Sequence, residues 1–104
     1  MAKFRLTTRA VLDLSEIADF TIQSFGIEQA RFYRDGFNNC FEVLAENPQL
    51  GRSAAELTPN LKRYEHQSPV VFYIPQDTDI LIVCILHQRM DFKQHLPSPA
   101  KTDN

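Results

Sequence analysis

Residues 80–86 read Ile-Leu-Ile-Val-Cys-Ile-Leu, and this run of seven apolar residues decides the fold of the chain. The run is too short for a helix of a globular protein and is rich in β-branched side chains, so it predicts a strand. A strand without a polar face needs cover on both sides of its sheet. The chain upstream offers only two good helices, so we expect one side of this strand to face away from them.

The composition predicts one soluble globular domain, because the chain has 104 residues, of which 43% are hydrophobic and 23% charged. We assign residues 1–96 to this domain and residues 97–104, which include two prolines, to a flexible C-terminal tail. The longest apolar run is far below the ~20 residues of a membrane span, and the N-terminus lacks the apolar segment of a signal peptide. We therefore expect a cytoplasmic protein without a membrane partner.

Cysteine and histidine spacing argues against a disulfide, a metal site and a cofactor. Cys40 and Cys84 both fall at apolar positions, which is typical of small reduced core residues. His66, His87 and His95 share no spacing that suits a metal ion. The sequence also lacks a glycine-rich phosphate loop and a nucleophile elbow, so we expect no metal and no cofactor.

The net charge of −2 hides an uneven distribution along the chain. Residues 10–47 carry seven acids and two bases, a balance of −5, whereas the remainder carries six acids and nine bases, a balance of +3. A protein that binds the backbone of a nucleic acid usually has more basic than acidic residues. We therefore expect no direct binding of nucleic acid.

Apolar periodicity predicts two helices after a short N-terminal strand at residues 3–7. Thr7 or Thr8 can cap the first helix, Gly26 can form the turn, and Asn47 before Pro48 ends the second helix. Gly36 predicts a close approach of the first helix. The predicted inner faces are Leu14, Ile17, Ala18, Thr21, Ile22 and Phe25 in the first helix, and Ala30, Tyr33, Phe37, Cys40, Phe41 and Leu44 in the second.

After a loop at residues 48–60, three strands at residues 61–65, 70–74 and 80–86 are separated by short turns. The sequence therefore predicts an α+β fold: an N-terminal strand, an antiparallel helix hairpin, and a three-stranded antiparallel meander that the helices cover on one face. Either Leu81, Val83 and Ile85 or the alternate set Ile80, Ile82, Cys84 and Leu86 would form an apolar patch on the other face. Alternatively, residues 90–96 fold back over that face.

A group of charged residues near the predicted strand ends could carry chemistry. Arginines with a histidine suit a metal-free ribonuclease, which must bind a phosphodiester and move protons. The same groups could form the polar rim of a protein-binding face, or a solvated strand edge. The group consists of Arg52, Lys62, Arg63, His87, Arg89 and Asp91.

Several short motifs, in order and spacing over about nine-tenths of the chain, resemble the ParE toxins of the RelE/ParE superfamily of bacterial type II toxin–antitoxin systems. Each motif alone is weak, and their common order makes the resemblance specific. They are residues 9–14 (Arg-Ala-Val-Leu-Asp-Leu), 16–17 (Glu-Ile), 25–26 (Phe-Gly), 29–30 (Gln-Ala), 44–52 (Leu-Ala-Glu-Asn-Pro-Gln-Leu-Gly-Arg), 70–73 (Val-Val-Phe-Tyr), 85–91 (Ile-Leu-His-Gln-Arg-Met-Asp) and 95–96 (His-Leu).

The resemblance implies the RelE/ParE-like fold and a non-enzymatic toxin that poisons DNA gyrase and is neutralised by a ParD-like antitoxin. We expect a disordered antitoxin segment to fold on the open sheet face and the helix hairpin. The expected antitoxin-binding residues are Val71, Tyr73, Leu81, Val83 and Ile85. The expected target-binding residues are Arg52, Arg63, His87, Arg89, Met90 and Asp91.

The alternative is a RelE-like, ribosome-dependent mRNA endoribonuclease, for which Arg63, His87 and Arg89 would be the catalytic candidates. The RelE branch is strongly basic and uses an arginine, a lysine and a C-terminal tyrosine. This chain is acidic overall and has no tyrosine after Tyr73, so the sequence favours the ParE branch.

Overall fold

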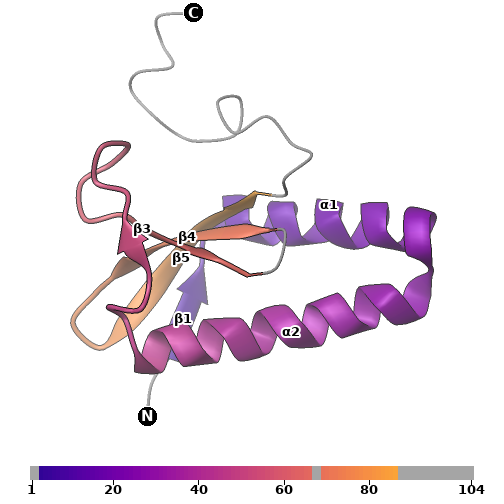
Figure 1. The fold of residues 1–104 in the computed structure, drawn as a ribbon, viewed down its shortest axis with the longest axis horizontal. Coiled ribbons are helices and arrows are strands. Elements are labelled where there is room, and N and C mark those ends of the chain that lie inside the picture. Colours follow the sequence, from indigo (N-terminus) through magenta and orange to yellow (C-terminus); the bar gives the residue numbers. More distant parts are fainter. Residues whose placement is uncertain (1–2, 67–68, 87–104) are drawn as a thin grey trace, which may run out of the picture.

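A computed structural model describes residues 3–66 and 69–86 of the chain (Figure 1). The described chain has the predicted order of an N-terminal strand, two helices and a final group of strands. The elements are β1 (Lys3–Leu6), α1 (Thr8–Phe25), α2 (Ile27–Glu46), β2 (Arg52–Ser53), β3 (Lys62–Glu65), β4 (Val70–Pro75) and β5 (Asp79–Leu86).

The helix hairpin begins, turns and ends where the sequence predicts. The Thr7 hydroxyl caps α1 by accepting a hydrogen bond of 2.9 Å from the Ala10 N–H. Gly26 has φ +98° and separates the two helices, a conformation that favours glycine. The helix α2 ends at Glu46, and the next N–H, of Asn47, donates to the carbonyl of Val43 before Pro48.

The five strands form one mixed sheet in the order β1-β5-β4-β3-β2. Strands β3, β4 and β5 form the predicted antiparallel meander, whereas β1 pairs with β5 in parallel. Strand β2 was not predicted; it lies within the loop predicted at residues 48–60 and pairs with β3. A strand of two residues is too short to produce a readable alternation of polar and apolar side chains.

An irregularity in the pairing of β4 and β5 changes which residues of β5 face the helices. Tyr73 is opposite Ile82 and Phe72 is opposite Cys84, so Val83 is an extra residue on β5. Ile80, Ile82 and Ile85 therefore belong to the core beneath the helices, whereas Val83, Cys84 and Leu86 belong to the cluster on the other face. Both of the strictly alternating sets predicted from the sequence are wrong for this reason.

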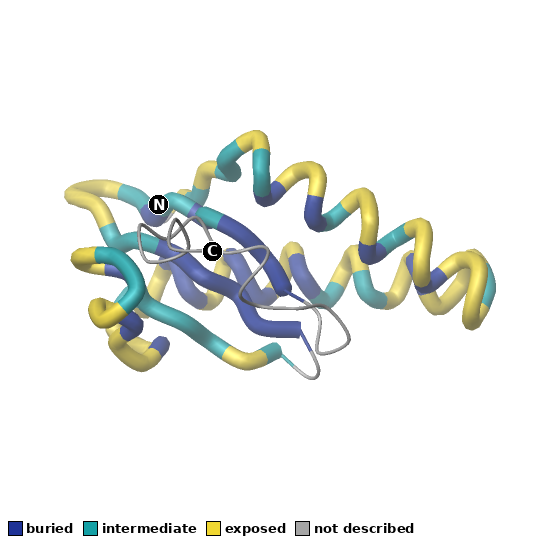
Figure 2. The backbone as a smooth tube through the Cα atoms, turned by 90° about the horizontal axis from the view of Figure 1, so that it is seen from above, coloured by how far each residue is buried: buried dark blue, intermediate teal, exposed yellow. Residues whose placement is uncertain are grey.

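Two apolar clusters cover the two faces of the sheet. The cluster on the helix side joins α1, α2 and β1 to the inward side chains of β4 and β5. On the other face, the segment of residues 54–61 contributes Ala54, Leu57 and Leu61 to a cluster with Phe72 and Cys84. The tube in Figure 2 is accordingly buried along most of β4 and β5. The face predicted to be open is closed at its centre, and the predicted cover by residues 90–96 lies outside the described residues.

Both cysteines are buried and free, as predicted from their apolar positions. Burial raises the pKa of the Cys40 thiol to about 11 and, with a smaller contribution from the Asp13 carboxylate, that of Cys84 to about 12. Both side chains are therefore protonated thiols at neutral pH, which suits small core residues.

The buried face of α1 is rotated relative to the predicted one. Its buried residues are Ala10, Asp13, Ile17 and Thr21, whereas Phe25 is 66% exposed. Asp13, which the predicted inner face does not include, has no exposed surface. The predicted approach of α1 to Gly36 is also wrong, because a Cβ atom there would meet the ring of His66, at 3.2 Å from Nε2.

Side chains of the first turns of α1 complete the hydrogen bonding of β5 beyond the end of β1. The last paired residues are Leu6 and Ile82, and the Thr7 N–H then donates to the Ile82 carbonyl. At the next residue of β5, Val83, the carbonyl accepts a hydrogen bond of 2.6 Å from the Thr7 hydroxyl. The Ile85 N–H donates to the Asp13 carboxylate at 3.0 Å. These bonds satisfy backbone groups that would otherwise be buried without a partner.

The buried hydroxyl of Tyr73 fixes the turn that follows α2. It donates to the carbonyl of Pro48 and accepts from the N–H of Gly51, both at 2.8 Å. A Cβ atom at position 51 would lie 2.6 Å from this hydroxyl, so only glycine fits there. The hydroxyl therefore sets the path of the chain from α2 into β2.

We expect Tyr73→Phe to lower the free energy of unfolding by ~1–3 kcal/mol, because the Gly51 N–H and the Pro48 carbonyl would lose their partner. Tyr64→Phe is the matched control, since no hydrogen bond of the Tyr64 hydroxyl is found among the described residues, and it should change stability by less than ~0.5 kcal/mol. Urea titrations of both variants measure the difference. Equal losses would contradict the anchoring role of Tyr73.

We expect Asp13→Ala to cost ~2–4 kcal/mol, because it leaves the buried Ile85 N–H without its acceptor and opens a small cavity. Glu16→Ala, on the exposed side of the same helix, should stay within ~0.5 kcal/mol. Thermal and urea unfolding of the two variants test this. A stable Asp13→Ala variant would show that α1 does not depend on this bond.

Candidate functional site

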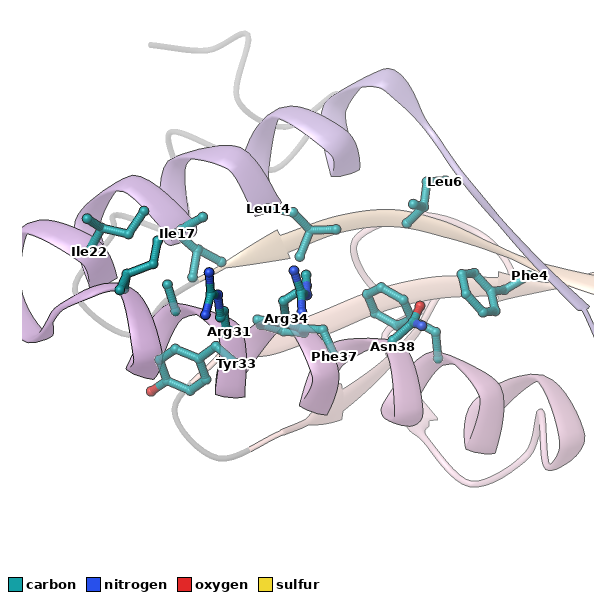
Figure 3. A pocket seen from close by; sticks show the side chains of 14 residues that line it. Phe4, Leu6, Leu14, Ile17, Ile22, Arg31, Tyr33, Arg34, Phe37 and Asn38 are labelled. Atoms are coloured by element: carbon teal, nitrogen blue, oxygen red, sulfur yellow. The ribbon is translucent and has the colours of Figure 1, made fainter.

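An open apolar groove runs between α1 and α2 above β1, with a volume of about 470 Å³ (Figure 3). Most of its lining side chains are aliphatic or aromatic, and they come from all three elements. The lining residues are Phe4 and Leu6 of β1, Leu14, Ile17, Ala18 and Ile22 of α1, and Ile27, Ala30, Arg31, Tyr33, Arg34, Phe37, Asn38 and Phe41 of α2.

The groove follows from the rotation of α1. Since Ala10, Asp13, Ile17 and Thr21 form the buried side of α1, the neighbouring stripe, which includes Leu14 and Ala18, borders the space between the helices. Alanine at position 18 on one wall and at position 30 on the other leaves that space unfilled. Phe4 closes the floor by packing edge-on against Phe41, with ring centroids 5.3 Å apart.

The hairpin turn extends the apolar surface beyond the groove. Ile22, Phe25 and Ile27 are 41%, 66% and 52% exposed, and Ile22 and Ile27 also line the groove. In Figure 1 this turn lies far from the strands, at the opposite end of the helices. A groove that continues into an exposed apolar tip is typical of a surface that binds a partner.

Three polar side chains, all from α2, line the groove. Arg31, Arg34 and Asn38 are exposed, and the Nε atom of Arg34 lies 3.3 Å from the Asp35 carboxylate. None of the seven acids of residues 10–47 lines the groove, whereas both bases of that segment do. The groove therefore combines an apolar interior with a basic rim on an otherwise acidic hairpin.

Three of the five residues predicted to bind an antitoxin have no exposed surface. Val71, Tyr73 and Ile85 lie in the core beneath the helices, because they share the inward side of β4 and β5. Leu81 and Val83 are half-buried, and Val83 packs with the cluster on the other face of the sheet. The groove was not predicted, although three of its lining residues, Leu14, Ala18 and Ile22, belong to the predicted inner face of the first helix.

Two of the predicted target-binding residues lie side by side. Arg52 of β2 is directly opposite Arg63 of β3, and Arg63 is in register with Phe72, whose side chain packs on the sheet face away from the helices. Neither guanidinium has a hydrogen bond or an ion pair with a described residue. Like charges in opposite positions destabilise a strand pair, so this arrangement favours an anionic partner over a purely structural role.

The other predicted target residues, His87, Arg89, Met90 and Asp91, lie outside the described residues. Of the ribonuclease candidates Arg63, His87 and Arg89, only Arg63 is described. The one described histidine, His66, packs on Phe37 with ring centroids 5.4 Å apart, on the helix side of the sheet, and burial lowers its pKa. Within the described ranges, no histidine lies beside Arg63.

The described residues contain neither a metal cluster nor a membrane span. No group of three histidine, cysteine, aspartate or glutamate side chains in residues 3–66 and 69–86 is placed to hold a metal ion. Neither described helix is both long and apolar enough to cross a membrane. Among the described residues, the groove and the arginine pair are the features that suit a binding partner best.

Comparison with known proteins identifies the family. A family model described as the ParE toxin of the type II toxin–antitoxin system parDE matches residues 4–92. The chain belongs to this family. It is 34% identical over 96 residues to Toxin ParE1 of Caulobacter vibrioides, which covers 92% of this chain and 99% of that protein. Toxin ParE1 of Mycobacterium tuberculosis is 31% identical over 96 residues, with 91% and 98% covered.

A solved structure has the same fold. The chromosomal ParDE toxin–antitoxin system from P. aeruginosa contains a chain that is 22% identical and superposes with a TM-score of 0.69. The similarity covers 84% of this chain and 96% of that one. The predicted ParE-like fold is therefore confirmed, with the correction that the sheet is mixed.

Proposed function

We propose that this ParE-family toxin is neutralised by a ParD-like antitoxin, and that a segment of the antitoxin folds into the groove between α1 and α2. The observation that carries this proposal is the groove itself, which is open, about 470 Å³ in volume and mostly apolar. An amphipathic helix that places anchors at i, i+3 or i+4, and i+7 into such a groove is a common mode of recognition.

The exposed side chains of the hairpin support a partner that folds on binding. Every residue from 22 to 29 is exposed or half-exposed, although Ile22, Phe25 and Ile27 are large and apolar. A disordered segment that folds on its target can follow a long surface of this kind, because it needs no preformed shape of its own. The half-buried Leu81 and Val83 would then contact the antitoxin only if its segment also reaches the sheet face away from the helices.

We further propose that the toxin acts without chemistry of its own, by binding DNA gyrase in the cytoplasm. The target surface would include Arg52 and Arg63, together with His87, Arg89, Met90 and Asp91 of the C-terminal segment. Two facts support binding over catalysis. No described proton donor or acceptor of the histidine type lies beside Arg63, and the net charge is −2.

The guanidinium groups of Arg52 and Arg63, which have no partner within residues 3–66 and 69–86, favour one competing function, a RelE-like ribonuclease, because such a pair also suits a phosphodiester. The test is to express the toxin without its antitoxin, and to measure gyrase-linked DNA breaks, DNA supercoiling and mRNA cleavage in the same cells. We expect breaks and lost supercoiling with intact mRNA. Cleaved mRNA with normal supercoiling would assign the chain to the ribonuclease class.

Ala18→Trp tests the groove, since a large ring on the wall of α1 would fill the space that the antitoxin segment needs. We expect this variant to stay folded, because Ala18 is only half-buried and the ring can occupy the groove. Co-expression with the product of the adjacent reading frame should then no longer rescue growth. The control is Asp19→Trp, one position further on the exposed side of α1, which should leave rescue intact.

A further inference from the structure

The charged side chains of the helix hairpin are distributed unevenly around the groove. Residues 10–47 contain only two bases, Arg31 and Arg34, and both line the groove. The same segment contains seven acids, and none of them lines it. Within residues 10–47, a carboxylate of a partner would therefore meet positive charge at the groove; Arg9, the other base of the hairpin, lies in the first turn of α1 and forms an ion pair with Asp13.

The two arginines are placed to act together. They are three residues apart on α2, so they lie on one side of the helix with an axial separation of about 4.5 Å. In Figure 3 both side chains extend from α2 into the space between the helices, towards the level of Leu14 and Ile17 of α1. Their guanidinium groups are at the rim and their aliphatic carbons border the apolar interior, as long cationic side chains commonly do.

Neither arginine is neutralised strongly within the described chain. Arg34 has one contact with Asp35, its neighbour in sequence, at 3.3 Å, and both side chains are 72% exposed, so the pair is weak. Arg31 is exposed and has no ion pair with a described residue. Both cations therefore keep most of their capacity for a partner, and a carboxylate of a docked helix could replace Asp35.

We propose that Arg31 and Arg34 determine which segment the groove accepts: an amphipathic helix that carries carboxylates, three or four residues apart, beside its apolar stripe. This inference rests on the proposed function, because it assumes that the antitoxin segment occupies the groove, and it adds the chemistry of that segment. Carboxylates at this spacing match the axial separation of the two guanidinium groups. An acidic helix placed against the acidic side chains of residues 10–47 meets like charge, which favours its placement in the groove.

The test uses the complete toxin and the antitoxin encoded by the adjacent reading frame, with dissociation constants measured at 50 mM and 500 mM salt. The variant Arg31→Gln/Arg34→Gln removes both charges and keeps most of each side chain. We expect affinity at low salt to fall at least about tenfold, and the salt dependence of binding to become much weaker. Lys3→Gln, which removes a positive charge from an exposed residue of β1 that does not line the groove, is the control and should change neither quantity.

Two further variants separate this inference from the proposal on which it rests. Ala18→Trp should abolish binding at both salt concentrations, because it fills the groove without changing its charge. Arg31→Glu/Arg34→Glu should bind more weakly than the glutamine variant, because it repels the same carboxylates. If Ala18→Trp binds normally, the groove is not the antitoxin site. If Ala18→Trp fails to bind and the glutamine variant matches the wild type at both salt concentrations, the role of the arginines is refuted.

Discussion

The fold depends on the hydrogen bonds that side chains at the start of α1 make with backbone groups of β5 beyond the end of β1. Strand β1 covers this edge only to Ile82, and the groups beyond it would be buried without partners. The Thr7 hydroxyl donates a hydrogen bond to the Val83 carbonyl, and the Asp13 carboxylate accepts one from the Ile85 N–H. These bonds attach the helix to the irregular part of β5 and set which side of α1 faces the sheet. They also cover an edge that could otherwise pair with another strand.

The groove is a consequence of the same constraint. Once Asp13 is held against β5, Ile17 and Thr21 lie on the same buried side of α1, and the apolar stripe of Leu14, Ala18 and Ile22 is left along the groove between the helices. The helices of 18 and 20 residues are also about 27 and 30 Å long, and the turn between them lies far from the strands (Figure 1). The end of the hairpin around Gly26 therefore has no sheet to pack on, and its large side chains stay exposed.

The sequence predicted the helices and the meander well, because their signals are local: a capping threonine, a turn glycine, a helix-ending proline and apolar periodicity. It could not predict the irregularity at Val83, since a run of seven apolar residues contains no polar residue that marks a change of face. That irregularity moved Ile85 into the core. The burial of Asp13 was missed because a carboxylate on a helix normally faces water. The groove was missed because it depends on the relative rotation of two helices.

The two candidate surfaces lie on opposite sides of the molecule, and this separation bears on how a toxin of this kind can be inhibited. The groove adjoins β1, at one end of the strand order and on the helix side of the sheet. Arg63 of β3 and Arg52 of β2 lie towards the other end of that order, on the opposite face, three and four strand spacings or ~14 and ~19 Å away. A helix confined to the groove would leave this pair uncovered. An antitoxin that blocks both surfaces must therefore continue from the groove around the sheet, for which a segment without a fixed fold is suited.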